Sequence, residues 1–331
     1  MKTSVIILTK NCCSTIGACL ERVAGQCISG DLEVIVIDSG STDGTLDIIR
    51  QFDVRLTEIP AQEFRHGRTR NFAASIATGD ILAYLTQDAL PLSSQWLASL
   101  TEPLLGNNEV AATYGRQIPR EDASFNTRAA LSKIYPDEPL VKRISDLPRL
   151  GLRAYHMTNA TSAYRRKVLE EIRFREDLIT CEDVAIAKEI LEKGYAISYV
   201  PTAAVEHSHN YSMAQAFRRY FDNGASYQRL GLFHGDGKQG IGIVKLGLSH
   251  ATAEARRALA DGGIATFVNS TAINAAKYIG FTLGRVERTL PTWLKRLIHC
   301  RIWQERKPHP PRIIGNGVAS GYYILKPLLH R

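Results

Sequence analysis

The sequence lacks the paired cysteines of a zinc clip or a thiol-exchange site. Its six cysteines include no Cys-x-x-Cys pair, so we expect reduced thiols, and 331 residues can bury a core without disulfides. It also lacks the run of about 18 uncharged apolar residues that a membrane-spanning helix needs. The closest stretch, residues 264–283, contains Asn269, Asn274 and Lys277. These absences predict a cytoplasmic chain that is soluble or attached to the face of a membrane.

The sequence also lacks a signal peptide, and its basic residues outnumber its acidic ones. The first apolar run ends at Leu8, too early for a signal peptide and without a small-residue cleavage site, so we expect the mature chain to start at Met1. The formal net charge is +8, with basic residues crowded into the C-terminal third. Such a charge suits lipid headgroups, nucleotide phosphates or nucleic acid. We expect no nucleic-acid partner, because aromatic side chains are only scattered among the basic ones.

Short apolar runs alternate with helical patterns over the first 120 residues. The runs cover residues 5–8, 32–37, 54–59 and 81–85, and helical patterns cover 14–26, 44–52 and 67–78. This alternation is typical of a parallel sheet that is buried on both faces. Because ligands of such sheets bind beyond the carboxyl ends of the strands, the candidates for a site follow each run: Thr9, Asp38, the loop of the 60s and Asp88.

The rest of the chain has a different pattern. Residues 124–152 contain three prolines and little periodicity, which we interpret as a mobile insertion or linker. A strand at 195–200 lies between helical patterns at 182–193 and 214–227, and helices follow at 241–259 and 291–303. Residues 235–240 have the Gly-x-Gly-x-x-Gly spacing, but helical patterns flank them, so we interpret them as a connector. We expect a domain at 1–230, with halves 1–120 (nucleotide-binding) and 121–230 (acceptor-binding), and a helical region at 231–331.

Two segments suit a nucleotide. Asp38 ends a buried strand and opens a tight polar turn, where its carboxylate can accept hydrogen bonds from a nucleobase or ribose. Helix capping is the alternative; it fits Asp43 but does not account for Asp38. Residues 64–71 place Gly67 and three arginines at the start of a helix, where amide groups and guanidinium groups can hold a diphosphate. The alternative for that segment is a solvated basic face.

Carboxylates and histidines supply the remaining candidates. Asp88 follows a buried strand and can ligate a divalent cation, or it can belong only to a turn. Glu182 and Asp183 open a helix, where acidic residues favour the dipole and where a carboxylate can also take a proton from a hydroxyl. His207 and His209 alternate in an extended segment, so we expect at most one to face a metal.

Taken in order, these motifs resemble the family-two glycosyltransferases, in particular the bacterial rhamnosyltransferase branch. The matching segments are 36–45, 66–71, 85–89, 115–117, 182–183, 207–209 and 217–222. The resemblance covers roughly residues 3–230 and continues weakly through 280–285. It implies an α/β fold of GT-A type, with a Rossmann-like, mainly parallel mixed sheet flanked by helices, and a helical C-terminal extension.

The resemblance also implies roles for residues. The donor-binding set is Thr9, Asp38, Ser39, Gly67, Arg70, Asn71, Thr86 and Gln87. Within it, Thr9 and Asp38 hold the nucleoside and Arg70 faces the diphosphate. Asp88 binds Mg²⁺ or Mn²⁺, and His207 or His209 completes that metal site.

Asp183, with Glu182 beside it, is implied to be the base that deprotonates the acceptor. Two positions depart from the family pattern. The usual Asp-Asp pair is Asp38-Ser39, and the usual Asp-x-Asp motif is Thr86-Gln87-Asp88. The second departure is typical of the rhamnosyltransferase branch.

The implied reaction is an inverting transfer of L-rhamnose from dTDP-L-rhamnose to a hydroxyl of a lipid-linked surface polysaccharide, such as O-antigen or capsule. Trp293, Leu294, Leu297 and Ile298 lie near one helical face beside basic residues, which suits a peripheral contact with the inner face of the cell membrane. An ordinary helix packed on the domain is the alternative. A non-catalytic scaffold that binds sugar nucleotides remains another reading. A sugar-phosphate nucleotidyltransferase is less favoured, because Gly-x-Gly-Thr-Arg is missing after the first strand.

Overall fold

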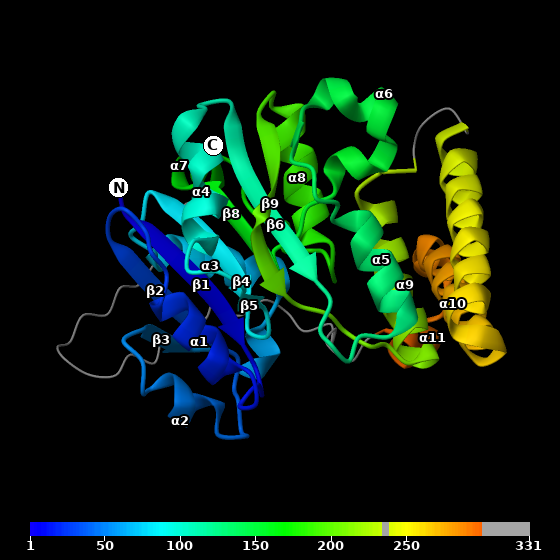
Figure 1. The fold of residues 1–331 in the computed structure, drawn as a ribbon, viewed down its shortest axis with the longest axis horizontal. Helices are drawn as coiled ribbons and strands as arrows, with labels where there is room; N and C mark the ends of the chain where they lie inside the picture. Colours follow the sequence, from blue (N-terminus) through cyan, green and yellow to red (C-terminus); the bar gives the residue numbers. More distant parts are fainter. Residues whose placement is uncertain (234–237, 300–331) are drawn as a thin grey trace.

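The computed structural model describes residues 1–233 and 238–299, and its centre is one mixed sheet of nine strands with helices on both faces (Figure 1). The strand order is β3-β2-β1-β4-β8-β6-β9-β5, and β7 pairs with β9 off this path. The strands are β1 (Thr3–Thr9), β2 (Leu32–Asp38), β3 (Arg55–Glu58), β4 (Ile81–Thr86), β5 (Leu90–Pro91), β6 (Val110–Ile118), β7 (Leu140–Lys142), β8 (Thr161–Arg165) and β9 (Ala196–Glu206). The α-helices are α1 (Ile16–Ala24), α2 (Thr45–Ile49), α3 (His66–Ile76), α4 (Trp96–Gly106), α5 (Phe125–Ile134), α6 (Leu147–Leu150), α7 (Arg166–Glu171), α8 (Glu182–Glu192), α9 (Met213–Arg229), α10 (Lys238–Arg285) and α11 (Thr292–Ile298).

The four strands predicted in the first 120 residues are confirmed and run parallel. β1 pairs with β2 and with β4, and β2 pairs with β3. The register places Thr9 beside Asp38 and Leu8 beside Thr86. The carboxyl ends of β1, β2 and β4 therefore meet at one edge of the sheet, where the sequence predicted a site.

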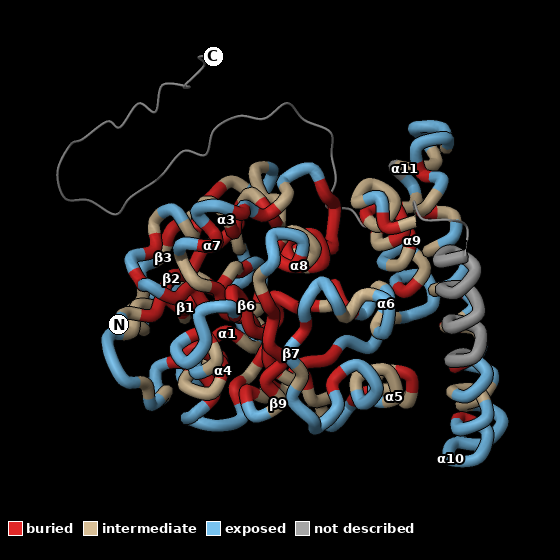
Figure 2. Tube along the Cα trace, turned by 90° about the horizontal axis from the view of Figure 1, so that it is seen from above, coloured by how far each residue is buried: buried red, intermediate tan, exposed pale blue. Residues whose placement is uncertain are grey.

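Both faces of these strands are buried, as their continuous apolar runs predicted. Successive side chains of a strand point to opposite faces, so Ile6 and Ile35 join one core cluster while Val5 and Ile7 join the other. Figure 2 shows this double core as buried chain on both sides of the strands. The sheet is consequently a rigid platform for the loops at its edge.

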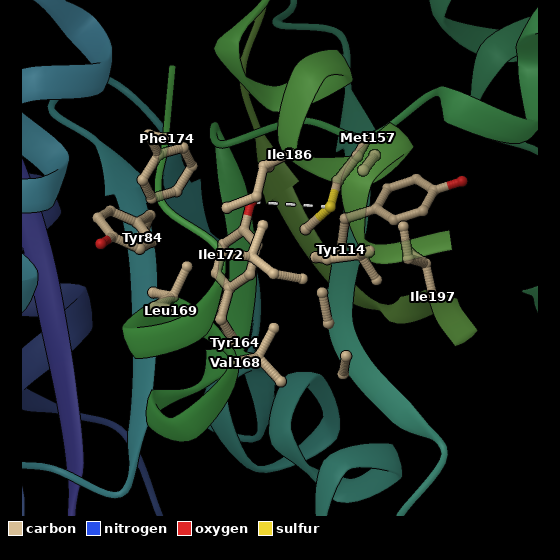
Figure 3. Close-up of a cluster of buried hydrophobic side chains, with 14 of the residues drawn as sticks. Tyr84, Tyr114, Met157, Tyr164, Val168, Leu169, Ile172, Phe174, Ile186 and Ile197 are labelled. Atoms are coloured by element: carbon tan, nitrogen blue, oxygen red, sulfur yellow. Dashed lines mark hydrogen bonds between the residues drawn. The ribbon is translucent and has the colours of Figure 1, made fainter. Parts of the chain in front are cut away.

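The sheet becomes mixed in its second half. β8 pairs antiparallel with both β4 and β6, and β6 then pairs parallel with β9. Aromatic rings fill the space beneath this junction: Tyr84, Tyr164 and Phe174 meet edge to face with centroids 5.4–5.7 Å apart (Figure 3). The Tyr164 hydroxyl group also reaches the sulfur of Met157 at 3.7 Å.

Residues 124–152, interpreted as a mobile insertion or linker, contain regular structure that their weak periodicity does not predict. The segment forms α5, β7 and α6, and β7 pairs antiparallel with β9 at the sheet. The helix α5 has a weak apolar pattern because one of its buried contacts is polar. Asn126 is 4% exposed and donates to Glu254 at 2.7 Å and to the Ser270 hydroxyl at 3.1 Å. Apolar periodicity does not reveal a face that is held by hydrogen bonds.

The predicted helical C-terminal region is confirmed for the residues described. The helix α10 consists of two segments that meet at Gly263, where φ is 70° and ψ is −173°. Ser270 donates to Glu254 at 3.4 Å, so the second segment, residues 264–285, folds back along the first. This second segment packs closely on α9: a Cβ on Gly284 would lie 2.0 Å from the carbonyl oxygen of Phe221. No helix in the described ranges is long and apolar enough to cross a membrane.

Candidate active site

The turn after β2 is organised around the buried carboxylate of Asp38, which is 0% exposed. Its Oδ1 accepts from the amides of Gly40 and Ser41 at 2.9 and 2.8 Å. Its Oδ2 accepts from the hydroxyl groups of Thr9 and Ser41 at 2.9 and 2.6 Å. A carboxylate offers about four acceptor positions, and the chain itself fills all of them. Asp38 therefore shapes this turn, and a nucleoside contact through its carboxylate would have to replace one of these hydrogen bonds.

The other predicted residues of this edge join neighbouring loops. The Ser39 hydroxyl donates to the carbonyl oxygen of Thr9 at 3.0 Å. The Gln87 side chain forms two hydrogen bonds with the backbone of Lys10: it accepts from the Lys10 amide at 2.7 Å and donates to the Lys10 carbonyl at 3.3 Å. The Thr86 hydroxyl oxygen is buried and has no hydrogen-bond partner in the described part of the chain. Thr9, Ser39, Thr86 and Gln87 thus lie together at one edge of the sheet.

The residues at the start of α3 contact other parts of the protein. Arg70 is 6% exposed, and its guanidinium lies 2.9 Å from the Glu182 carboxylate. A Cβ on Gly67 would lie 2.0 Å from the carbonyl oxygen of Arg175, so glycine permits close approach there. Asn71 donates to the Phe174 carbonyl at 2.9 Å and accepts from its amide at 3.0 Å. Gly67 and Asn71 therefore hold α3 against the segment that leads to α8.

Two adjacent acids open α8 and have opposite environments. Burial opposes ionisation of Glu182, but Arg70 and then His66 outweigh it and lower the pKa of Glu182 to about 2. Asp183 has no ion-pair partner among the described residues, and its Oδ1 accepts from the Val184 amide at 2.8 Å. Burial, together with the charge of Glu182, raises the pKa of Asp183 to about 7. Asp183 is thus a carboxyl group able to exchange a proton near neutral pH.

The residue before this pair has an unusual backbone. Cys181 has φ 64° and ψ 28°, the left-handed region that residues with a side chain rarely adopt. Its thiol contacts Asn223 of α9 through a 3.5 Å hydrogen bond. Strained positions of this kind cost on the order of 1–3 kcal/mol and cluster at functional sites. The bend directs the start of α8 toward α9.

The predicted metal residues come together. The ligand atoms of Asp88, His207 and His209 all lie within 4.8 Å of one another. The Nε2 atoms of His207 and His209 lie 3.4 and 3.7 Å from the Asp88 carboxylate. The alternation expected for His207 and His209 does not hold: β9 ends at Glu206, so the strand geometry stops there and both rings reach Asp88. Burial opposes ionisation of Asp88, but His207, His209 and Arg120 outweigh it and lower its pKa to about 2.

A buried hydrogen-bond chain orients His207. Gln117 donates through Nε2 to the Tyr135 hydroxyl at 2.5 Å and to the Thr158 hydroxyl at 3.1 Å. Its oxygen lies 2.7 Å from Nδ1 of His207, so Nδ1 carries a proton. The other ring nitrogen, Nε2, lies 3.4 Å from the Asp88 carboxylate. This contact is favourable when Nε2 also carries a proton or when a cation lies between the two groups.

Sequence reasoning missed Arg219 on α9. This residue is exposed, and no ion pair joins it to any described residue. Its positive charge partly opposes the rise in the pKa of Asp183, and it adds to burial and His207 in lowering the pKa of His209. Asn223, one turn later on the same helix, contacts Cys181 just before α8. The run Phe217–Asp222 was noted only as a motif, and nothing in its spacing distinguishes Arg219 from Arg218.

Comparisons with known proteins agree with this geometry. A family model described as glycosyl transferase family 2 matches residues 4–173. A mannosyltransferase structure from Pyrobaculum calidifontis, in complex with GDP-Man and Mn²⁺, superposes with a TM-score of 0.59 at 21% identity and covers 86% of each chain. At that identity the superposition shows the GT-A fold alone.

Two curated relatives extend over most of the chain. The O-antigen chain rhamnosyltransferase RfbN of Salmonella typhimurium strain LT2 is 34% identical over 322 residues, which is 93% of this chain and 96% of the relative. The O-antigen chain rhamnosyltransferase WbaN of Salmonella anatum is 36% identical over 285 residues, which is 84% of this chain and 85% of the relative. The chain therefore belongs to glycosyl transferase family 2, in its bacterial rhamnosyltransferase branch.

Proposed function

We propose that this glycosyltransferase moves L-rhamnose from dTDP-L-rhamnose, with inversion at the anomeric carbon, to a hydroxyl of a lipid-linked O-antigen acceptor. The names of RfbN and WbaN support the sugar and the polymer. The observation that carries the chemistry is the pair of acids at α8: Arg70 holds Glu182 ionised, and burial together with the charge of Glu182 raises the pKa of Asp183. Family membership sets aside the nucleotidyltransferase alternative.

The proton transfer follows from Asp183. As the acceptor oxygen forms its bond to the anomeric carbon, the hydroxyl proton moves to the Asp183 carboxylate. The bond between that carbon and the diphosphate oxygen breaks in the same step, and dTDP leaves with the electron pair. A single displacement inverts the configuration at the anomeric carbon. The products are the rhamnosylated acceptor, dTDP and protonated Asp183, which returns its proton to water.

The residues around Asp88 fit a divalent cation. One carboxylate and two imidazole rings bring their ligand atoms within 4.8 Å of one another. Imidazole ligands favour Mn²⁺ over Mg²⁺, which prefers oxygen ligands. When bound there, the ion supplies positive charge near the departing diphosphate.

Arg219 takes the role that the sequence assigned to Arg70. A guanidinium group binds phosphate oxygens through paired hydrogen bonds, but only when it is not already held by a carboxylate. Arg219 is exposed and its charge acts on both Asp183 and His209, whereas Arg70 is buried against Glu182. We assign Arg219 to the diphosphate of the donor.

The proposed contact with the membrane depends on the exposed side chains of α11. Trp293 and Leu297 of α11 are 67% and 64% exposed, and Leu294 and Ile298 are half-buried. We propose that α11 touches the inner face of the cell membrane, where a lipid-linked glycan is held, and that the chain works in the cytoplasm. Residues 300–303 of the predicted helix lie outside the described residues.

Donor turnover tests the proposal. Wild type, Asp183→Asn and Glu192→Gln are compared with a panel of nucleotide sugars, with and without Mn²⁺ or Mg²⁺; Glu192 is an exposed acid on the same helix and serves as the matched control. We expect turnover of dTDP-L-rhamnose that falls by about 10²–10⁴ in Asp183→Asn while donor binding persists. Binding without turnover in wild type, given an acceptor-rich extract, would favour the scaffold reading. Preference for another nucleotide sugar would overturn the assigned donor.

A further inference from the structure

Gln117 of β6 lies behind the candidate metal site, in contact with His207. The parallel pairing of β6 with β9 places Gln117 beside Val205, two residues before His207. The His207 amide then donates to the carbonyl oxygen of Ile118 at 3.0 Å. Nδ1 of the ring lies on Gln117 and Nε2 lies toward Asp88. The strand pairing therefore brings the Gln117 side chain to the side of His207 that faces away from Asp88.

Two hydroxyl groups determine how the Gln117 amide is turned. Its Nε2 donates to the hydroxyl groups of Tyr135 at 2.5 Å and Thr158 at 3.1 Å. The Thr158 oxygen also accepts from the Ala160 amide at 3.2 Å, so both of its acceptor positions are filled. With Nε2 directed at these hydroxyl groups, Oε1 is the atom that lies 2.7 Å from Nδ1 of His207. The amide thus presents an acceptor to the ring.

Tyr135, the closer of the two hydroxyl partners, is itself fixed in the core. It is 3% exposed, and its ring packs on His156 and Tyr199 with centroids 5.6 and 6.2 Å away. The Tyr199 hydroxyl group donates to the carbonyl oxygen of Pro136 at 2.7 Å, which holds the chain next to Tyr135. The hydrogen bonds of Gln117 therefore end on packed groups and not on solvent.

The two histidines of the site differ in how they are held. The side chain of His207 is 10% exposed, whereas that of His209 is 45% exposed. Gln117 contacts Nδ1 of His207, but the residues that the structure describes give the His209 ring no hydrogen bond. A fixed acceptor on the far nitrogen of an imidazole sets the orientation of the ring and makes its other nitrogen a stronger metal ligand. Metal affinity should therefore depend on Gln117 as well as on His207.

We propose that Gln117 is a positioning residue of the metal site: it accepts the Nδ1 proton of His207 and directs Nε2 toward a cation beside Asp88. The proposal rests on the cation assigned above to Asp88, His207 and His209. The alternative is that Gln117 only satisfies buried hydroxyl groups. In that case its loss would lower stability and leave metal affinity unchanged.

Mn²⁺ binding separates these two roles. Calorimetric titration with Mn²⁺ at saturating dTDP measures affinity without turnover. Gln117→Leu keeps the size of the side chain and removes the acceptor, so it should weaken Mn²⁺ binding by about 10–100-fold. Added to His207→Ala, the same change should cost less than about twofold more, because the ring through which it acts is gone. Wild-type affinity in Gln117→Leu, or an equal loss in both backgrounds, overturns the proposal.

A conservative variant and a matched control complete the test. Gln117→Glu keeps an acceptor for Nδ1, and the hydroxyl groups of Tyr135 and Thr158 can rotate to donate to its other oxygen. Its Mn²⁺ affinity should stay within about threefold of wild type or be tighter. Thr161→Val removes a different buried hydroxyl group, which accepts from Nε1 of Trp96 at 2.9 Å. It should lower the melting temperature and leave Mn²⁺ affinity unchanged. Binding by Gln117→Glu as weak as that of Gln117→Leu would show that the acceptor is not responsible.

The test also distinguishes failure of this proposal from failure of the proposed reaction. A wild-type protein that binds no Mn²⁺, with or without dTDP, overturns the role of Gln117 together with the assigned cation. Release of dTDP from dTDP-L-rhamnose by that same protein in the presence of a chelator would leave the rhamnosyl transfer itself standing. Mn²⁺ binding that Gln117→Leu weakens and Gln117→Glu restores supports the role of Gln117, whichever sugar the enzyme transfers.

Discussion

Replacement of Glu182 by glutamine should move the pH dependence of catalysis without removing the base. The Glu182 charge raises the pKa of Asp183, and Arg70 lowers it. Glu182→Gln removes the first effect and releases Arg70 from its 2.9 Å ion pair, so both changes lower the pKa of Asp183. Two charges about 7 Å apart at an effective dielectric constant of about 20 interact by roughly 2 kcal/mol, which is one to two pKa units.

The role of Asp183 as a base determines the direction in which kcat/KM changes with pH. Only the ionised carboxylate accepts a proton, so kcat/KM in wild type should rise with pH through a pKa near 7 and level off above it. At pH 6 wild type should work about tenfold below its plateau, whereas Glu182→Gln should be within about twofold of its own plateau. The shift to lower pH is expected even if the plateau itself falls.

The assay is initial-rate transfer from dTDP-L-rhamnose between pH 5 and 9 at saturating Mn²⁺, so that loss of metal does not imitate loss of base. Glu192→Gln, on the exposed end of α8, should keep the wild-type profile. A Glu182→Gln profile that coincides with wild type, or moves to higher pH, would refute the electrostatic account. Residual activity of Asp183→Asn with the same acid limb would show that another group is the base.

Three other changes have expected outcomes. Arg219→Gln should lower kcat/KM by about 10–100-fold, with donor affinity measured by calorimetry falling in parallel, while its exposed neighbour Arg218→Gln serves as control and stays near wild type. Gly67→Ala should lower the melting temperature and destabilise the fold by about 1–3 kcal/mol, because its Cβ would lie 2.0 Å from a carbonyl oxygen; an unchanged melting temperature contradicts the packing. Burial, reinforced by Arg153, lowers the pKa of Lys142 to about 7, so the unfolded chain binds its proton more readily and wild type loses stability as the pH falls from about 10 to 7. Lys142→Met should remove that loss, and urea unfolding at pH 7 and 9.5 should show the larger stabilisation at pH 7.

The part of the site that the sequence predicted depends on strand ends. Strands that are buried on both faces have continuous apolar sequences, so the sequence predicts them. Because parallel strands end at one edge of the sheet, the sequence also predicts that Thr9, Asp38 and Asp88 lie at that edge. The adjacent acids Glu182 and Asp183 are a separate signal, because they stand at the predicted start of a helix. These inferences needed only local pattern and the geometry of a parallel sheet.

The parts that could not be predicted depend on contacts between distant segments. Arg70 and Glu182 are separated by more than one hundred residues, and only the fold shows that each neutralises the other. The sequence did not predict the helix α5, because Asn126 attaches it to α10 through buried hydrogen bonds and such a contact produces no periodic pattern of apolar residues. His209 reaches Asp88 because β9 stops at Glu206, and a strand end is the feature that periodicity locates least well.

Arg70 and Arg219 illustrate why a basic loop at a helix start does not by itself identify a phosphate site. A guanidinium group is equally suited to a phosphate and to a carboxylate, so its residue type does not reveal its partner. Arg70 meets a carboxylate inside the protein, and this contact holds Glu182 ionised beside Asp183. Glu182 in turn raises the pKa of Asp183, so under the proposed mechanism Arg70 acts on the reaction through the base, and Arg219 is the arginine that we assign to the diphosphate. Loss of Arg70 should therefore change the acid limb of the pH profile, whereas loss of Arg219 should change chiefly the binding of the donor.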